Sequence, residues 1–124
     1  MSVLATPGYA WDVTVGGDVA WVSDRQGGVR VLSLADPAAP REIGAYEGGM
    51  TLGVTLRGRY AYVADGPLGL TVLDVTDPAR PVRVGGYTPP GTATGVVLDG
   101  DLAYLVSGRE GLRVVDISDP TRPR

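Results

Sequence analysis

One stretch of this sequence occurs three times. Its middle copy spans residues 61–78, and similar copies lie at residues 20–37 and 103–120. The glycines that hold the same place in the three copies are 41 and 42 residues apart. A period of roughly 40 to 45 residues is typical of four-stranded propeller blades or of paired helices, so the local pattern must decide between the two.

The local pattern within one repeat favours strands. Residues 53–56 and 59–64 are β-prone runs on either side of Arg57-Gly58, which predicts a hairpin with a type I′ turn, because both central residues of that turn need positive φ. Residues 70–75 are almost continuously apolar or β-branched, which predicts a strand buried on both faces.

A fourth strand is predicted at residues 82–87. It follows Asp77-Pro78, a pair that suits a type I turn because the Asp side chain accepts a hydrogen bond from the following backbone and Pro presets φ. The predicted fold class is therefore all-β: a β-propeller of four-stranded antiparallel blades, with three blades in a single unit of residues 1–124. The predicted repeats are residues 6–46, 47–87 and 88–124.

The last repeat stops where its fourth strand would begin. Counting back 41 residues from Tyr46 reaches Ala5, so residues 1–5 are predicted to be the displaced fourth strand of that repeat. Rings of blades typically hold about four to eight, so three blades are too few to close. We expect a six-bladed ring formed by a C2 homodimer, in which an N-terminal strand is exchanged; a nine-bladed homotrimer and a piece of a longer propeller are the alternatives. The residues predicted to close the ring are Met1, Ser2, Val3, Leu4 and Ala5.

The most regular part of the repeat resembles the LVIVD-repeat family. The matching segments are Leu112–Asp116 and Leu70–Asp74, each followed by a Ser or Thr and then by Asp-Pro. The resemblance implies a β-propeller of the kind found in bacterial and archaeal proteins, which are often secreted or lie at the cell surface. Ser33 stands where the other repeats have Asp, so that carboxylate has no essential role in every blade. The resemblance brings no catalytic residues with it.

The composition excludes several chemistries. The sequence has no histidine, cysteine or lysine, so it cannot build a Ser-His-Asp triad, a thiol nucleophile, a cysteine-ligated metal site or a Schiff base by itself. The net charge is -3 and the arginines are scattered, which argues against a nucleic-acid partner. We expect no cofactor and no membrane partner. No signal peptide is recognisable, so the compartment is not encoded in these residues.

Residues that break the repeat are the candidates for a site, because positions shared by all repeats serve packing. Asp12, beside Trp11, replaces the glycines of the other two repeats, and the loops between the second and third strands also diverge. These residues are predicted to form a polar rim with an aromatic contact, suited to a peptide, a glycan or another protein. The predicted rim comprises Trp11, Asp12, Asp24, Arg25, Glu47, Asp65, Arg109 and Glu110.

The prediction for function is a non-enzymatic, self-assembling scaffold or interaction module. The alternative is a ligand-binding module or a carboxylate-dependent enzyme, a hydrolase or lyase, with its site at the channel mouth around Asp12. Asp74 and Asp116 lie in otherwise apolar strands and are predicted to accept hydrogen bonds from backbone or arginine rather than to transfer protons.

Overall fold

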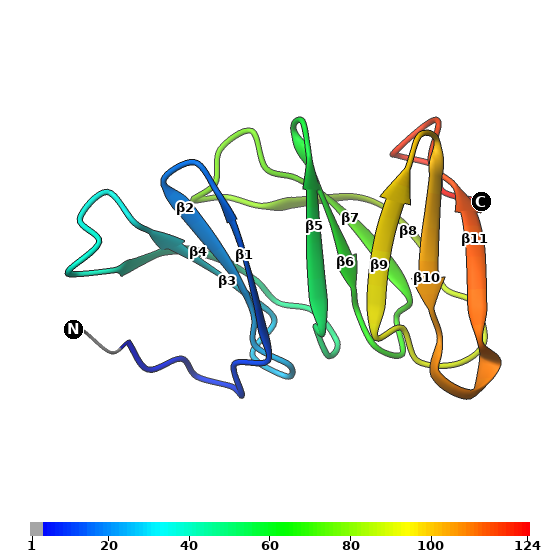
Figure 1. Ribbon diagram of the computed structural model, residues 1–124, viewed down its shortest axis with the longest axis horizontal. Helices are drawn as coiled ribbons and strands as arrows, with labels where there is room; N and C mark the ends of the chain where they lie inside the picture. Colours follow the sequence, from blue (N-terminus) through cyan, green and yellow to red (C-terminus); the bar gives the residue numbers. More distant parts are fainter. Residues whose placement is uncertain (1–3) are drawn as a thin grey trace.

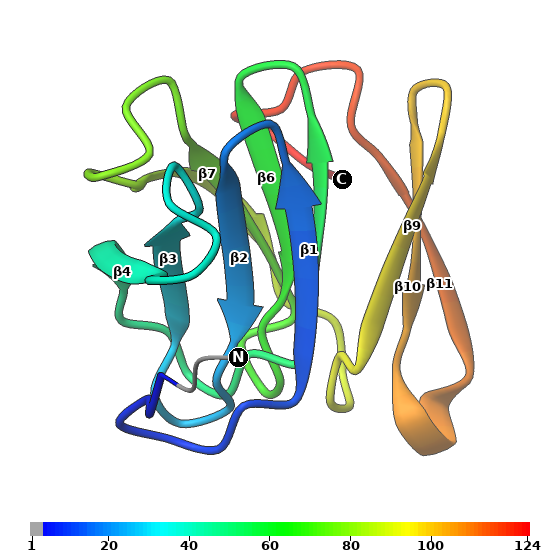
Figure 2. The ribbon, with the colours of Figure 1, turned by 60° about the vertical axis from the view of Figure 1, so that its left-hand side comes forward.

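The computed structural model describes residues 4–124, which form three antiparallel sheets (Figures 1 and 2). The first sheet contains β1 (Asp12–Gly16), β2 (Val19–Ser23), β3 (Val29–Ser33) and β4 (Arg41–Tyr46). The second contains β5 (Gly53–Arg57), β6 (Tyr60–Ala64), β7 (Leu70–Asp74) and β8 (Val82–Tyr87). The third contains β9 (Gly95–Asp99), β10 (Leu102–Val106) and β11 (Leu112–Asp116). The predicted all-β class is confirmed.

The short 3-10 helix η1 (Gly108–Glu110) joins β10 to β11, and no helix among residues 4–124 is long and apolar enough to cross a membrane.

Strands that follow one another in the chain are neighbours within each sheet, and the three sheets stand in a row (Figure 1). The first strands of successive sheets lie side by side. Thr14 Oγ1 donates to the Val54 carbonyl at 2.7 Å, and Thr55 Oγ1 donates to the Val96 carbonyl at 2.8 Å. This arrangement is the one expected of propeller blades, in which the first strands are innermost.

The cores lie between the sheets. Trp21, Val29 and Val31 of the first sheet pack against Val63 and Leu73 of the second. The opposite face of the second sheet packs in the same way against the third sheet. That core includes Tyr62, Leu70, Val72, Leu105 and Val115. The second sheet therefore has two buried faces, and the prediction that its third strand is buried on both is confirmed for the four residues from Leu70 to Leu73.

The hairpin turns differ from the prediction by one position. β5 pairs Arg57 with Tyr60, so the two loop residues are Gly58 and Arg59 rather than Arg57 and Gly58. Gly58 has φ 58°, but Arg59 does not have positive φ. Positive φ at the first loop residue alone is the pattern of a type II′ turn, so the predicted type I′ turn is wrong.

The turn between the third and fourth strands is confirmed. The Asp77 carboxylate accepts a hydrogen bond from the Ala79 N–H at 3.0 Å, and the Asp77 carbonyl accepts one from the Arg80 N–H at 2.9 Å. The same contacts recur at Asp36 and Asp119. These turns are built by the Asp-Pro sequence itself.

Within residues 4–124, the third sheet has three strands, and β11 is its edge. Asp116, the last residue of β11, exchanges two backbone hydrogen bonds with Arg124. Leu4 and Ala5 form no strand, and Leu4 is 41% exposed. Of the residues predicted to close a ring, Met1, Ser2 and Val3 lie outside the described residues.

Candidate functional site

The loops with the divergent residues lie at one end of the molecule. In Figure 1 the connections from β2 to β3, from β6 to β7 and from β10 to β11 are at the bottom, together with the segments that lead into β1, β5 and β9. Each such segment is fixed to the loop of the sheet that it enters. The N–H groups of Trp11, Leu52 and Thr94 donate to carbonyls at the end of the second strand, at 2.8 to 2.9 Å.

Two of the predicted rim residues are not on the surface. Asp24 and Asp65 are both 0% exposed. The Asp24 carboxylate accepts hydrogen bonds from Thr6 Oγ1 at 2.6 Å and from the Gly8 N–H at 2.7 Å. Both donors belong to the segment that enters β1. Asp24 therefore fastens that segment to its sheet, and its inclusion in an exposed rim is wrong.

Asp65 has the same role in the second sheet. Its carboxylate accepts hydrogen bonds from Tyr46 Oη at 2.9 Å, the Gly49 N–H at 2.9 Å and Thr71 Oγ1 at 2.8 Å. Burial raises the pKa of the Tyr46 phenol above its ordinary value, and the nearby Asp65 carboxylate adds to the rise, so the phenol stays protonated and able to donate. A buried carboxylate needs such donors, and here Tyr46 of the first sheet and Thr71 of the second sheet both supply one.

The third sheet has Ser107 at this position. Its hydroxyl is buried and has no hydrogen-bond partner among the described residues. Serine is shorter than aspartate and carries no charge, so this loop lacks the fastening that the other two loops share.

An aromatic cluster stands at the entrance to the first sheet. Tyr9 and Trp11 are 60% and 57% exposed, and their ring centroids are 6.3 Å apart. The Arg25 guanidinium carbon lies 5.6 Å from the Tyr9 centroid and 5.3 Å from the Trp11 centroid, which is within cation–π range of both rings. The structure thus brings together two predicted rim residues, Trp11 and Arg25.

Arg25 is the only residue other than glycine with positive φ among residues 4–124, at 52°. The equivalent residues are Gly66 and Gly108, at 55° and 59°. A side chain in this region of φ costs about 1 kcal/mol or more, so the first repeat accepts strain that the others avoid. Arg25 also makes a backbone bridge with Thr51 of the segment that enters the second sheet.

Tyr9 belongs to this cluster but was not among the predicted rim residues. The signal was present in the sequence, because the equivalent residues are Met50 and Thr92 and neither is aromatic. Met50 also touches the cluster, since its sulfur lies 4.0 Å from Arg25 Nη2.

Asp12 lies at the start of β1, where its carboxylate accepts a hydrogen bond from the Val13 N–H at 2.9 Å. It borders a shallow depression of about 340 Å³ lined by Ala10, Trp11, Val13 and Val22. The lining other than Asp12 is apolar and offers no second carboxylate. Among residues 4–124, no group of three acidic side chains is placed to hold a metal ion.

The remaining rim residues are exposed and lie apart from the aromatic cluster in the chain. Glu47 makes a surface ion pair with Arg30 at 3.7 Å, of the kind that contributes little to stability. Arg109 and Glu110 are exposed residues of η1, in the third sheet. The predicted rim is therefore divided into buried, clustered and solvent-exposed residues rather than forming one site.

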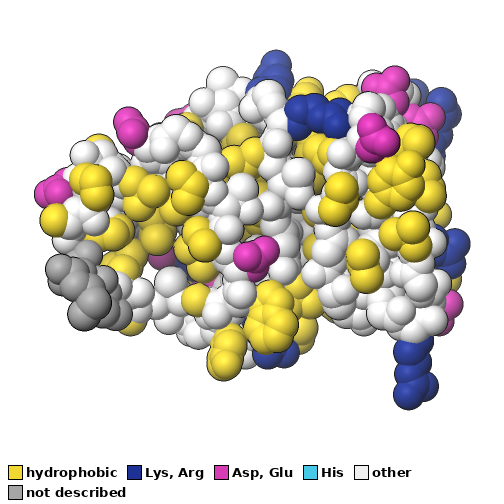
Figure 3. All heavy atoms as spheres, viewed as in Figure 1, with side chains coloured by type: hydrophobic (Ala, Val, Ile, Leu, Met, Phe, Trp, Pro, Cys, Tyr) yellow, Lys and Arg dark blue, Asp and Glu magenta, His cyan; other side chains and the backbone are white. Residues whose placement is uncertain are grey.

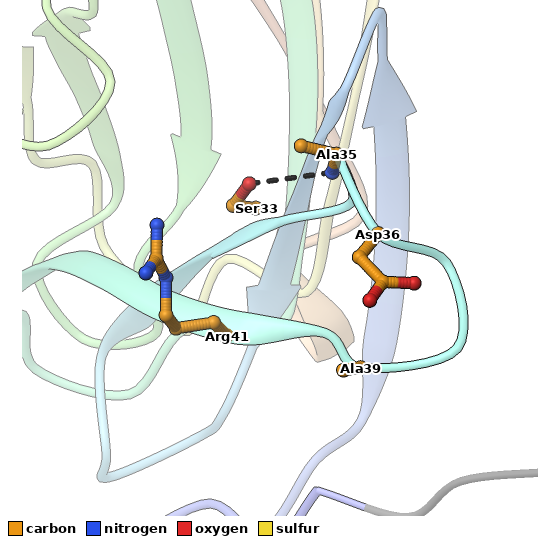
Figure 4. Close-up of a pocket in the computed structure, with 5 residues that line it drawn as sticks. All are labelled: Ser33, Ala35, Asp36, Ala39 and Arg41. Atoms are coloured by element: carbon orange, nitrogen blue, oxygen red, sulfur yellow. Dashed lines mark hydrogen bonds between the residues drawn. The ribbon is translucent and has the colours of Figure 1, made fainter.

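A second depression of about 330 Å³ lies at the end of β3 (Figure 4). It is lined by Ser33, Ala35, Asp36, Ala39 and Arg41. The Ser33 hydroxyl accepts a hydrogen bond from the Ala35 N–H at 3.3 Å, while Asp36 and Arg41 point in different directions. These side chains do not converge on a common point, so the depression offers no chemistry.

Asp74, by contrast, is fully bonded, and the prediction for it is confirmed. Its carboxylate accepts hydrogen bonds from the Thr76 hydroxyl and N–H and from the Arg59 guanidinium. These contacts, those of Thr76 first, lower the pKa of Asp74 to about 2. Asp116 accepts a bond from the Ser118 N–H, which likewise lowers the pKa of its carboxyl. Both carboxylates accept hydrogen bonds from residues just beyond their strands.

Comparison with known proteins agrees with the repeat structure. No curated protein matches the chain. The family model described as the LVIVD repeat matches three times, at residues 7–47, 48–89 and 90–124. These matches cover nearly all of the chain and correspond to the three sheets. The protein therefore belongs to the LVIVD-repeat family.

Proposed function

We propose that this chain is a non-enzymatic interaction scaffold whose three sheets join those of a second copy to form a six-bladed ring. The observation that carries the proposal concerns the two outer faces of the row of sheets. The outer face of the third sheet repeats the apolar residues that a sheet packs against the following sheet. The outer face of the first sheet repeats those that a sheet packs against the preceding sheet. The two buried carboxylates, whose described donors come from the fold itself, and the separation of the exposed polar residues in residues 4–124 support a role without catalysis.

The outer face of the third sheet is apolar and exposed. Leu112 and Val114 of β11 are 58% and 54% exposed, and Val106 of β10 is 45% exposed. The repeat places Leu112 and Val114 where the first sheet has Val29 and Val31, both fully buried against the second sheet. The third sheet therefore presents side chains that pack against a following sheet elsewhere in the molecule.

The outer face of the first sheet is the complementary half. Most of the residues that the second sheet turns toward the preceding sheet are apolar, and their equivalents in the first sheet are apolar too, although Thr71 on that face corresponds to Arg30 in the first sheet. Those equivalents are Val13, Ala20, Val22 and Leu32, matching Val54, Ala61, Val63 and Leu73. Val13 is 56% exposed, whereas Ala20, Val22 and Leu32 are 4%, 8% and 8% exposed. The first sheet thus repeats the residue types that the second sheet packs against its preceding sheet.

These two faces fit each other but not themselves, so a ring forms by head-to-tail contact. In a ring of two copies each contact occurs twice and six blades result, a number within the usual range. Burying each half-exposed Leu or Val contributes about 1 to 2 kcal/mol, and every such gain is doubled by the symmetry.

Light scattering during size exclusion tests the proposal with a matched pair of variants. Val114→Asp places a charge in the proposed contact and should convert dimers to monomers. Val82→Asp makes the same change at a residue of similar exposure, 56% against 54% for Val114, at the first residue of β8, and should leave dimers intact. Monomers of the unaltered chain, or equal behaviour of the two variants, would contradict the proposed assembly.

A further inference from the structure

We propose that Tyr9, Trp11 and Arg25 form a binding site for an acidic glycan, in which Arg25 binds the carboxylate of a uronic acid residue and the two aromatic rings contact its sugar ring. The site lies in the first sheet alone, so it goes beyond the proposed assembly and does not depend on it. Three observations carry it: all three residues depart from the repeat, the arginine lacks an anionic partner among residues 4–124, and the rings are exposed.

The cluster consists of residues that only the first repeat has. The equivalent residues of the other two repeats are neither aromatic nor basic. They are Met50, Leu52 and Gly66 in the second repeat and Thr92, Thr94 and Gly108 in the third. The fold brings the three departures together, because the Arg25 guanidinium carbon lies 5.6 Å from the Tyr9 centroid and 5.3 Å from the Trp11 centroid. The packing of a sheet does not require this cluster, since the other two sheets form without it.

The backbone of Arg25 has a conformation that favours glycine, with φ at 52°. Strained residues cluster at ligand-binding sites, where the strain positions a side chain for its ligand. The side-chain contacts of Arg25 within residues 4–124 are with the two aromatic rings and with the sulfur of Met50. None of these groups carries a negative charge. The strain therefore holds a cation beside two rings without giving it an anion.

The hydrogen-bonding capacity of the Arg25 guanidinium is largely unused. Its Nε is buried and has no hydrogen-bond partner among the described residues, and its Nη2 lies 4.0 Å from the Met50 sulfur, a weak acceptor. Arg30 of the same sheet differs, because it pairs with both Glu42 and Glu47. Arg25 is half-buried, so its charge has lost part of its hydration. A carboxylate that accepts from both terminal nitrogens would replace that hydration with strong charge-assisted hydrogen bonds.

The aromatic rings add an apolar surface beside the cation. Tyr9 and Trp11 are 60% and 57% exposed, and their ring centroids lie 6.3 Å apart at an interplanar angle of 48°. Figure 3 shows hydrophobic side chains and a basic side chain gathered at the lower edge of the molecule, below the start of β1. Rings exposed in this way can contact the C–H groups of a sugar ring, while the phenol hydroxyl and the indole N–H supply hydrogen bonds at the edge of the apolar area.

The size and charge of the cluster favour a uronic acid over an acidic peptide. The three groups lie 5.3 to 6.3 Å from one another, so the ligand must carry its carboxylate close to an apolar ring. A uronic acid has both on one sugar unit, whereas the acidic residues of a peptide carry no ring. Asp12, exposed beside Trp11, would repel a run of acidic residues but can accept hydrogen bonds from sugar hydroxyls.

Nuclear magnetic resonance tests the site, because the chain has only two tryptophans and the other one, Trp21, is 3% exposed in a core. Trigalacturonate and trimannuronate are each titrated beside their methyl esters, which have the same rings without the charge. At least one acid should shift the indole N–H signal of Trp11 but not that of Trp21, with a Kd of about 1 mM, and its ester should bind at least about tenfold more weakly.

A matched pair of variants assigns the effect to the arginine. Arg25→Gly introduces the residue that the other two loops have at this place, so the fold should be kept. The acid should bind to this variant at least about tenfold more weakly. Arg109→Gly makes the same change at an exposed arginine of η1 and should bind the acid as the unaltered chain does.

Three results would overturn the site. Equal binding of an acid and its ester, or of the acid to Arg25→Gly and to the unaltered chain, would show that the arginine does not bind the carboxylate. No shift of the Trp11 signal by either acid at about 10 mM would exclude the glycan. A shift of that signal by a short peptide with one glutamate, without any shift by the two acids, would assign the cluster to a peptide instead.

Discussion

Replacing Asp65 by alanine should destabilise the protein strongly, because it removes the acceptor shared by three donors. Thr71 is buried and loses a partner that no water can readily replace, whereas Gly49 is exposed and Tyr46 is half-buried. A buried donor left without a partner costs about 1 to 3 kcal/mol and each of the other two hydrogen bonds contributes about 0.5 to 1 kcal/mol, so the expected loss is about 3 kcal/mol. Small domains are stable by roughly 5 to 15 kcal/mol, so this is a large share.

Urea unfolding followed by circular dichroism measures this loss. With a slope of about 1.5 kcal/mol/M, the midpoint should fall by about 2 M. Asp77→Ala is the matched control, since Asp77 is an exposed carboxylate with one turn hydrogen bond, and its replacement should cost about 0.5 to 1 kcal/mol. All variants are compared at one protein concentration, because assembly shifts the midpoint. If Asp65→Ala unfolds within about 0.3 M of Asp77→Ala, Asp65 is not a fastening residue.

Two further perturbations have defined outcomes. The pKa of Asp74 is lowered to about 2 by Thr76 and Arg59, so the ionised carboxylate stabilises the folded state above about pH 4, and that contribution is lost as the pH falls toward 2. Asp74→Asn should therefore flatten the dependence of stability on pH between about pH 4 and 2. An unchanged dependence in acid titration would contradict the assignment. Gly69→Ala should be several kcal/mol more destabilising than Gly58→Ala in thermal unfolding. Both residues have positive φ, but only at Gly69 would an added Cβ meet a backbone oxygen, at a distance of 2.4 Å. Equal losses of stability in the two variants would show that φ alone decides the effect.

The fold could be predicted from the sequence because the repeat supplies the same signal three times. β-Prone runs, Gly-containing turns and Asp-Pro turns predicted strand positions to within about one residue, including the third strand with two buried faces. The turn type between the first two strands could not be predicted in this way. Arg57-Gly58-Arg59 permits the loop to begin at either of two residues, and the pairing of Arg57 with Tyr60 selects Gly58-Arg59.

The candidate site was predicted less well, because divergence between repeats does not reveal burial. Asp24 and Asp65 stand in polar loops and differ from Ser107, which is also the pattern of surface residues that vary freely. Apart from Thr71, the donors to these two carboxylates come from segments 16 or more residues away, which only the fold brings near. Arg25 could have been singled out more sharply, since it replaces glycines at a turn that requires positive φ.

The native mass of the unaltered 124-residue chain is the most direct test of the proposed assembly. The two complementary end faces predict a species of twice 12.9 kDa, held together at micromolar concentration and dissociated by Val114→Asp. A single chain of 12.9 kDa at the same concentration would contradict the ring, and a species of three chains would contradict its six blades.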